Sequence, residues 1–183
     1  MRIVAGQYRG KKLFTPEGKE VRPTSERARE AVFNILNSHL GSDYSAVHLA
    51  DIFAGTGAFG LEALSRGAAS VTLVDKDIWL LSKNVKIFAK EQSKIRIIKA
   101  DALNLPRIGH KFNMVFMDAP YAKGLTEEVL KQLIEKEWLA KNSLCIVEIR
   151  KDEHIDIPSE YEVLDERVYG LAKILFLDPK IAK

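Results

Sequence analysis

Four consecutive residues, Asp118-Ala119-Pro120-Tyr121, follow directly after the apolar run 114–117 and could hold a flat group that carries an amine. The Asp118 carboxylate and the Ala119 carbonyl can each accept one N–H of an exocyclic amine. The ring of Tyr121 can stack on the base that bears the amine. On its own, such a string is more often an acidic turn that ends a strand. The segments that precede it favour a catalytic role.

A glycine-rich segment, residues 51–60, is the second candidate. Gly55, Gly57 and Gly60 allow a sharp turn and a close approach of the backbone to a ligand. Their spacing, with Asp75 twenty residues after Gly55, also matches the dinucleotide fingerprint, so an NAD site is an alternative.

The acidic residues around this segment favour a different ligand. Asp51 precedes the glycines, where a carboxylate would repel a pyrophosphate. Asp75 could bind both hydroxyls of a ribose, and Asp101 could accept from an adenine amino group. An adenosine that carries a sulfonium and an amino acid fits this acidic rim better than a diphosphate does.

Strands and helices alternate from residue 47 onward. We expect strands at 47–53, 70–74, 95–100, 113–117 and 144–149, a terminal β pair at 161–168 and 173–177, and helices at 60–66, 79–90 and 125–136. Apolar strands that alternate with helices predict a doubly wound, mostly parallel α/β sheet. Ligands of such sheets bind at the carboxyl ends of the strands. Four of the expected strands end near Asp51, Asp75, Asp101 and Asp118.

The first part of the chain is basic. Residues 1–21 predict a short β-hairpin, and a helix is expected to begin at a cap formed by Thr24 or Ser25. Six basic side chains here are candidate phosphate contacts: Arg2, Arg9, Lys11, Lys12, Arg22 and Arg27. A solvated basic hairpin with surface salt bridges explains the same residues about as well.

Composition limits the class of protein. With 183 residues and 46% apolar content, the chain can form one core and not two. A single cysteine, Cys145, excludes an intrachain disulfide, and uncharged stretches are too short for a membrane span, so we expect a cytoplasmic protein with no membrane partner. The histidines at 39, 48, 110 and 154 have no metal spacing, and no metal is expected. Trp79 and Trp138 are expected to be packing residues.

The motifs together resemble class I S-adenosylmethionine-dependent methyltransferases that act on exocyclic amines. The whole chain is similar to one branch, the bacterial 16S ribosomal RNA guanine-N2 methyltransferases. The segments that carry this likeness are Met1–Gly6, Tyr8–Gly10, Arg22–Arg27, Ala31–Leu36, Phe53–Gly57, Gly60–Ala68 and Asp118–Gly124. They span nearly the full length. The family usually has a proline where this chain has Ala119, but alanine supplies the same carbonyl, and Pro120 still favours an extended residue before it.

This resemblance implies a Rossmann-like domain at residues 22–183, with seven strands and an antiparallel C-terminal strand, preceded by the hairpin at 1–21. It implies S-adenosylmethionine as methyl donor and 16S rRNA as partner, within an assembling or assembled small subunit, for a monomeric enzyme. Asp118, Ala119, Pro120 and Tyr121 would be catalytic. The donor would contact Thr24, Asp51, Phe53, Ala54, Gly55, Thr56, Gly57, Asp75, Lys76, Asp101 and Ala102. An adenine-N6 methyltransferase and a non-catalytic RNA-binding assembly factor remain alternatives.

Overall fold

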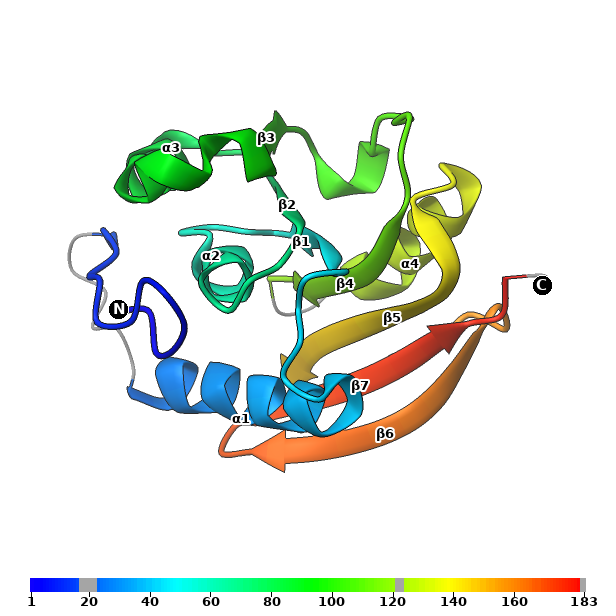
Figure 1. The fold of residues 1–183 in the computed structure, drawn as a ribbon. Helices are drawn as coiled ribbons and strands as arrows, with labels where there is room; N and C mark the ends of the chain where they lie inside the picture. The colour runs from blue at the N-terminus through cyan, green and yellow to red at the C-terminus, as the bar shows by residue number, and fades with distance from the viewer. Residues whose placement is uncertain (17–22, 121–123, 182–183) are drawn as a thin grey trace.

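The computed structural model describes residues 1–16, 23–120 and 124–181, except for the side chains of residues 23–25 (Figure 1). In chain order the elements are α1 (Pro23–Leu40), β1 (His48–Ile52), α2 (Ala58–Ser65), β2 (Ser70–Asp75), α3 (Trp79–Val85), the 3-10 helix η1 (Lys86–Lys94), β3 (Ile95–Lys99), the 3-10 turn η2 (Ala102–Asn104), β4 (Phe112–Asp118), α4 (Leu125–Glu135), β5 (Leu139–Arg150), β6 (Tyr161–Tyr169) and β7 (Ala172–Pro179).

The strands form one seven-stranded sheet in the order β3-β2-β1-β4-β5-β7-β6. Strands β1 to β5 pair in parallel, and β7 is antiparallel to both β5 and β6. This confirms the predicted doubly wound sheet with an antiparallel strand near the C-terminus. The strand order reverses between β1 and β4, so the carboxyl ends of these two strands border the crevice where such folds bind ligands.

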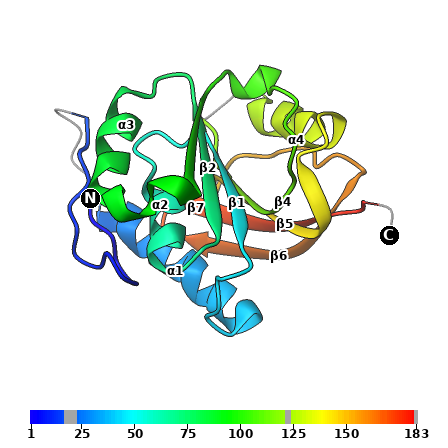
Figure 2. The same ribbon diagram turned by 45° about the horizontal axis from the view of Figure 1, so that its top comes forward.

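Each face of the sheet has its own apolar cluster. Helices α1, α2 and α3 pack on one face, through residues such as Phe33, Leu61 and Leu81. Helix α4 and η2 pack on the other, where Leu130 and Trp138 are fully buried. Figures 1 and 2 show α1 and α4 on opposite sides of the sheet. The buried strands explain the continuous apolar runs in the sequence.

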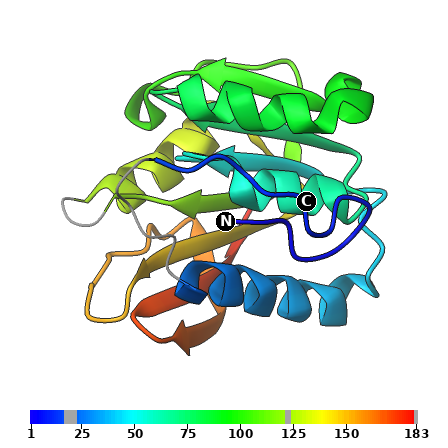
Figure 3. The same ribbon diagram turned by 90° about the vertical axis from the view of Figure 1, so that its left-hand side faces the viewer.

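The N-terminal segment crosses the first of these faces. Figure 3 shows it in front of α2, between α1 and α3. A single β-bridge joins Arg2 to Lys12, which makes a minimal hairpin, and Ile3, Tyr8 and Leu13 are buried in the same cluster as the helices. The boundary expected between residues 21 and 22 lies outside the described residues. None of the helices in the described parts of the chain is long and apolar enough to cross a membrane.

Two elements differ most from their expected bounds, and the other bounds differ by a few residues at most. The helix expected at 79–90 is α-helical only to Val85 and then tightens into η1, with a kink at Phe88 (φ −100°, ψ 42°). Phe88 is fully buried and its ring lies 4.4 Å from that of Tyr8, so tertiary packing overrides helical continuity there. Strand β5 begins at Leu139, five residues before the expected start, because a register shift between Phe112 and Met114 accommodates the added residues.

The two tryptophans have opposite environments. Trp138 is fully buried, and its indole N–H donates to the Pro106 carbonyl oxygen at 2.8 Å. Trp79 is 62% exposed, with Lys83 Nζ 3.7 Å from the centre of its ring. The expectation that both pack internally was therefore wrong for Trp79. Its apolar neighbours in the sequence suggested burial, but it begins α3 on the solvent side.

This difference gives a direct test of the fold by fluorescence. Iodide should quench the emission of Trp79 because its ring is open to solvent and lies beside a lysine, whereas Trp138 should be protected. We expect Trp79→Phe to remove most of the iodide-sensitive emission and to leave a blue-shifted residual spectrum. Equal quenching of the wild type and Trp79→Phe would contradict this arrangement.

Candidate active site

Two cavities meet at the carboxyl ends of β1 and β4. The larger, of about 460 Å³, lies over β2, β3 and β4, and the smaller, of about 220 Å³, faces α1 and α2. Phe53, Gly55 and Asp118 line both. The larger cavity is also lined by Asp75, Lys76, Asp101, Ala102, Ala119 and Pro120, and the smaller by Met1, Arg29, Asp51, Ala54, Thr56, Phe59, Phe116 and Glu148.

The loop after β1 forms the wall between the cavities. Phe53 adopts a left-handed conformation (φ 61°), which is rare for a residue with a side chain and concentrates at functional sites. Gly57 also has a positive φ, 77°, and a Cβ there would come within 2.6 Å of the Leu81 side chain. The tight turn thus requires glycine at this position. Unlike its neighbours in the loop, Gly57 is absent from the residues that line either cavity.

Asp75 is held in place by two backbone amides. Gly55 N–H donates to its Oδ2 at 2.7 Å and Asp77 N–H to its Oδ1 at 3.0 Å. Further along the same cavity, Lys76 Nζ lies 2.8 Å from Asp101 Oδ2. The hydrogen bond from Lys76, together with that from Leu103 N–H, holds the pKa of Asp101 below its usual value. Both acids therefore lie at the cavity, where the sequence places them.

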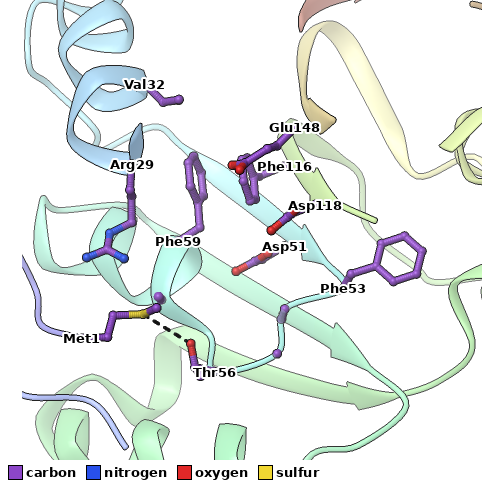
Figure 4. Close-up of a pocket in the computed structure, with 13 residues that line it drawn as sticks. Met1, Arg29, Val32, Asp51, Phe53, Thr56, Phe59, Phe116, Asp118 and Glu148 are labelled. Carbon is purple, nitrogen blue, oxygen red and sulfur yellow. Dashed lines mark hydrogen bonds between the residues drawn. The ribbon is translucent and has the colours of Figure 1, made fainter. Parts of the chain in front are cut away.

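Three carboxyl groups share one face of the sheet. Asp51 is opposite Phe116 in the register of β1 and β4, and Asp118 is opposite Glu148 in that of β4 and β5. Because side chains alternate along strands, Asp51, Asp118 and Glu148 emerge on the same side. Figure 4 shows the three carboxyl groups pointing to the same side, into the smaller cavity.

Burial raises the pKa of each of these acids. The pKa of Asp51, which is 2% exposed, rises to about 7, although the Gly60 N–H donated to its Oδ2 at 2.9 Å opposes the rise. The Asp118 carboxyl is open to solvent from the cavity, yet the surrounding protein raises its pKa to about 6. Burial, with the nearby charge of Asp118, raises the pKa of Glu148 to about 8. Such shifts concentrate at functional sites.

The predicted site residues mostly come together here. Asp51, Phe53, Ala54, Gly55, Thr56, Asp75, Lys76, Asp101, Ala102, Asp118, Ala119 and Pro120 all line the two cavities. Tyr121 and Arg22 lie outside the described residues, as does the side chain of Thr24. Of the predicted phosphate contacts, Arg2, Arg9, Lys11, Lys12 and Arg27 are exposed. Three of them, Arg2, Arg9 and Arg27, line a separate groove of about 490 Å³ together with Glu26 and Glu30.

Sequence reasoning missed several lining residues. Glu148 was detectable, because it follows the apolar run 145–147 just as Asp118 follows 114–117. The stacked rings of Phe59 and Phe116, 3.6 Å apart and nearly parallel, come from α2 and β4, and their spacing in the sequence does not reveal that they meet. Arg29 lies on α1, and its place depends on the packing of that helix.

A family model described as Conserved hypothetical protein 95 matches residues 1–178. Ribosomal RNA small subunit methyltransferase D of Escherichia coli is 36% identical over 173 residues, which cover 93% of this chain and 85% of that protein. The chain belongs to the ribosomal RNA small subunit methyltransferase D family.

Solved structures agree with this family. A structure titled as the putative methyltransferase yhhF from Escherichia coli has a TM-score of 0.80 and 35% identity, and covers 97% of this chain and 96% of its own. A more distant structure is similar in fold alone: magnesium protoporphyrin IX methyltransferase from Synechocystis, solved with bound S-adenosylmethionine. Its TM-score is 0.64 and its identity is 14%, and the match covers 92% of this chain and 86% of that one. The sheet of this family member is thus the class I methyltransferase fold.

The raised pKa of Asp51 predicts how the stability of this family member depends on pH. The pKa is about 7 in the folded chain and ordinarily 3.8, so between these values the folded state binds a proton that the unfolded state releases. The free energy of unfolding should therefore rise as the pH falls from 8 to 5, and this gain should be lost as the pH rises through about 7.

Asp51→Asn should reduce that dependence, because asparagine does not titrate, and should leave the part that comes from Asp118 and Glu148. Urea denaturation at pH 5, 6.5 and 8 measures the free energy of unfolding of both proteins. Asp156→Asn, at a side chain that is 94% exposed, is the matched control and should follow the wild type. A wild-type curve and an Asp51→Asn curve that stay parallel across this range would contradict the assignment.

Proposed function

We propose that this protein transfers a methyl group from S-adenosylmethionine to the exocyclic N2 amine of a guanine in 16S rRNA, acting in the cytoplasm as a monomer on the assembling or assembled small subunit. One observation carries the proposal: Asp118 lines both cavities, and Ala119 follows it in the wall of the larger one. A carboxylate and a carbonyl thus stand where two ligands could meet. The family and the names of its members support rRNA as substrate.

The larger cavity suits the adenosine part of the donor. Asp75 is fixed by backbone amides, which orients its carboxylate for ribose hydroxyls, and Ala102 and Pro120 offer apolar contact for a purine. Asp101 could accept from the adenine amino group once Lys76 yields part of its contact. The acidic lining of both cavities suits a cationic sulfonium better than a pyrophosphate. When bound, S-adenosylmethionine supplies an electrophilic methyl group and leaves as a neutral thioether that retains the electron pair of the broken C–S bond.

Asp118, which ends β4, and Ala119 after it would prepare the nucleophile. The lone pair of an exocyclic amine is delocalised into the ring, which makes the amine a weak nucleophile. If Asp118 and the Ala119 carbonyl each accept one N–H, the amine turns and its lone pair is freed to form the new N–C bond. The amine becomes acidic as that bond forms, so Asp118 can take the proton without being a strong base. Alignment of this kind supplies much of the rate.

Exposed basic residues would position the RNA. Arg2, Arg9 and Arg27 line one groove, and Lys11 and Lys12 are exposed on the same N-terminal segment. Phosphate contacts of this kind fix register and carry no sequence information. The amine can be reached only in an unstacked base, such as a loop or flipped nucleotide.

The experiment is methyl transfer to small subunits purified from cells that lack the protein. Labelled S-adenosylmethionine is supplied, and the rRNA is digested and analysed by mass spectrometry. We expect N2-methylguanosine at one position, which is also missing from the rRNA of the deletion strain. N6-methyladenosine would instead establish the adenine alternative. Calorimetry that detects no donor binding would favour the non-catalytic assembly factor.

A further inference from the structure

The strand beside β4 brings a second carboxyl group to Asp118. Glu148 is opposite Asp118 in the parallel register of β4 and β5, and neighbouring strands lie about 4.8 Å apart. Both side chains line the smaller cavity. Figure 4 shows the Glu148 carboxyl reaching into the cavity beside the rings of Phe59 and Phe116, on the same side as the Asp118 carboxyl.

Glu148 has no structural role that explains its position. Within residues 1–16, 23–120 and 124–181, its carboxyl group makes no hydrogen bond or ion pair. Arg29 lines the same cavity, but its guanidinium donates to the Arg2 carbonyl oxygen at 2.6 Å, and its Nε lies 3.6 Å from Glu62 Oε2. A half-buried carboxyl group without a partner costs free energy, so a ligand is the natural explanation for it.

The rest of the smaller cavity fits the edge of a flat base. Its walls include the parallel, stacked rings of Phe59 and Phe116 and the side chain of Val32. Acceptor oxygens and apolar surface thus lie together in this cavity. A purine held by its amine at Asp118 would place its neighbouring ring atoms toward Glu148.

We infer that Glu148 binds the N1–H of the target guanine while Asp118 and Ala119 hold its N2 amine, and that Glu148 thereby selects guanine over adenine. This inference rests on the proposed function. Guanine presents N1–H directly beside its amine, where adenine presents a lone pair. A carboxyl group keeps an acceptor oxygen in either protonation state, and when protonated it also donates to guanine O6. Guanine therefore gains one hydrogen bond more than adenine in either state.

The first test compares two substitutions at this position. Glu148→Leu should lower kcat/KM for transfer to small subunits by about 10- to 100-fold, the range for loss of one base-specific contact. Glu148→Gln keeps a carbonyl acceptor and an N–H donor at the same place, so it should recover most of that loss. Glu162→Leu, at an exposed position near the start of β6, is the matched control and should behave as the wild type.

The second test changes the base instead of the protein. Once the modified nucleotide is mapped, 2-aminopurine is placed there; it keeps the N2 amine but has a lone pair at N1. The wild type should have a kcat/KM for guanine that is about tenfold or more above that for 2-aminopurine. For Glu148→Leu, the ratio of these two kcat/KM values should be near one. Equal transfer by the wild type to both bases would overturn the inference, even if the leucine variant failed to fold.

Donor affinity distinguishes a role of Glu148 in binding the base from a role in binding S-adenosylmethionine. Calorimetry should give the same Kd for S-adenosylmethionine with the wild type and Glu148→Leu. If the variant loses donor affinity by the same factor as kcat/KM, Glu148 belongs to the donor site and the inference is wrong. If the wild type makes no N2-methylguanosine, the proposed function itself fails. If the wild type makes N2-methylguanosine and the kcat/KM of Glu148→Leu is within about threefold of the wild-type value, only the role of Glu148 is wrong.

Discussion

Replacing Asp118 with alanine is expected to lower kcat for methyl transfer by at least about 100-fold, the usual cost of removing a group that acts on the developing transition state. The carboxylate lies where the two cavities meet, and no other described acid lines both. Without it, one N–H of the amine has no acceptor and the lone pair stays in the ring. Single-turnover transfer to small subunits measures the effect.

Donor binding distinguishes this loss from a damaged fold. Asp118→Ala should keep its Kd for S-adenosylmethionine within a few-fold, because Asp75 and the loop after β1 remain. Asp156→Ala, at an exposed side chain, is the matched control and should transfer at the wild-type rate. Transfer by Asp118→Ala within about tenfold of wild type would show that the role assigned to this residue is wrong.

Glu62→Ala is expected to lower the free energy of unfolding by about 3–5 kcal/mol, because it leaves buried charges uncompensated. The Glu62 side chain is fully buried in α2. Its carboxylate accepts the N–H groups of Val4 and Ala5 at 2.8 and 2.9 Å and that of Arg66 Nε at 3.0 Å. It also pairs with Arg29, which is 6% exposed.

Chemical denaturation with urea measures this change. Glu135→Ala, at an exposed position in the last turn of α4, is the matched control and should shift stability by less than about 0.5 kcal/mol. Glu62→Gln should fall between the two, since it keeps an acceptor oxygen but loses the charge. A midpoint for Glu62→Ala equal to that of Glu135→Ala would contradict the role of Glu62.

The sequence predicted the sheet well because its strands are buried on both faces. Runs such as 114–117 and 145–147 are apolar throughout, and the helices between them leave few other topologies. The strand-end acids Asp51, Asp75, Asp101 and Asp118 could be found by the same rule, since parallel strands place their carboxyl ends at one edge. Glu148 obeys that rule too.

Other parts of the site depend on contacts between distant residues. The kink at Phe88 arises because its ring packs against Tyr8, eighty positions earlier in the chain. The left-handed Phe53 has no local cause such as a glycine, so only the packed loop reveals it. Arg29 reaches the cavity because Glu62 and the Arg2 carbonyl hold it there. Such long-range arrangements leave no periodic pattern in the sequence.

The contact between Glu62 and the amides of Val4 and Ala5 also has a thermodynamic consequence. It joins the basic N-terminal segment to α2, which starts immediately after the loop that follows β1. Under the proposed function, an RNA bound to that segment and a donor bound to that loop are linked through this contact. Each of the two substrates should consequently tighten the other, by the same factor in either order of addition.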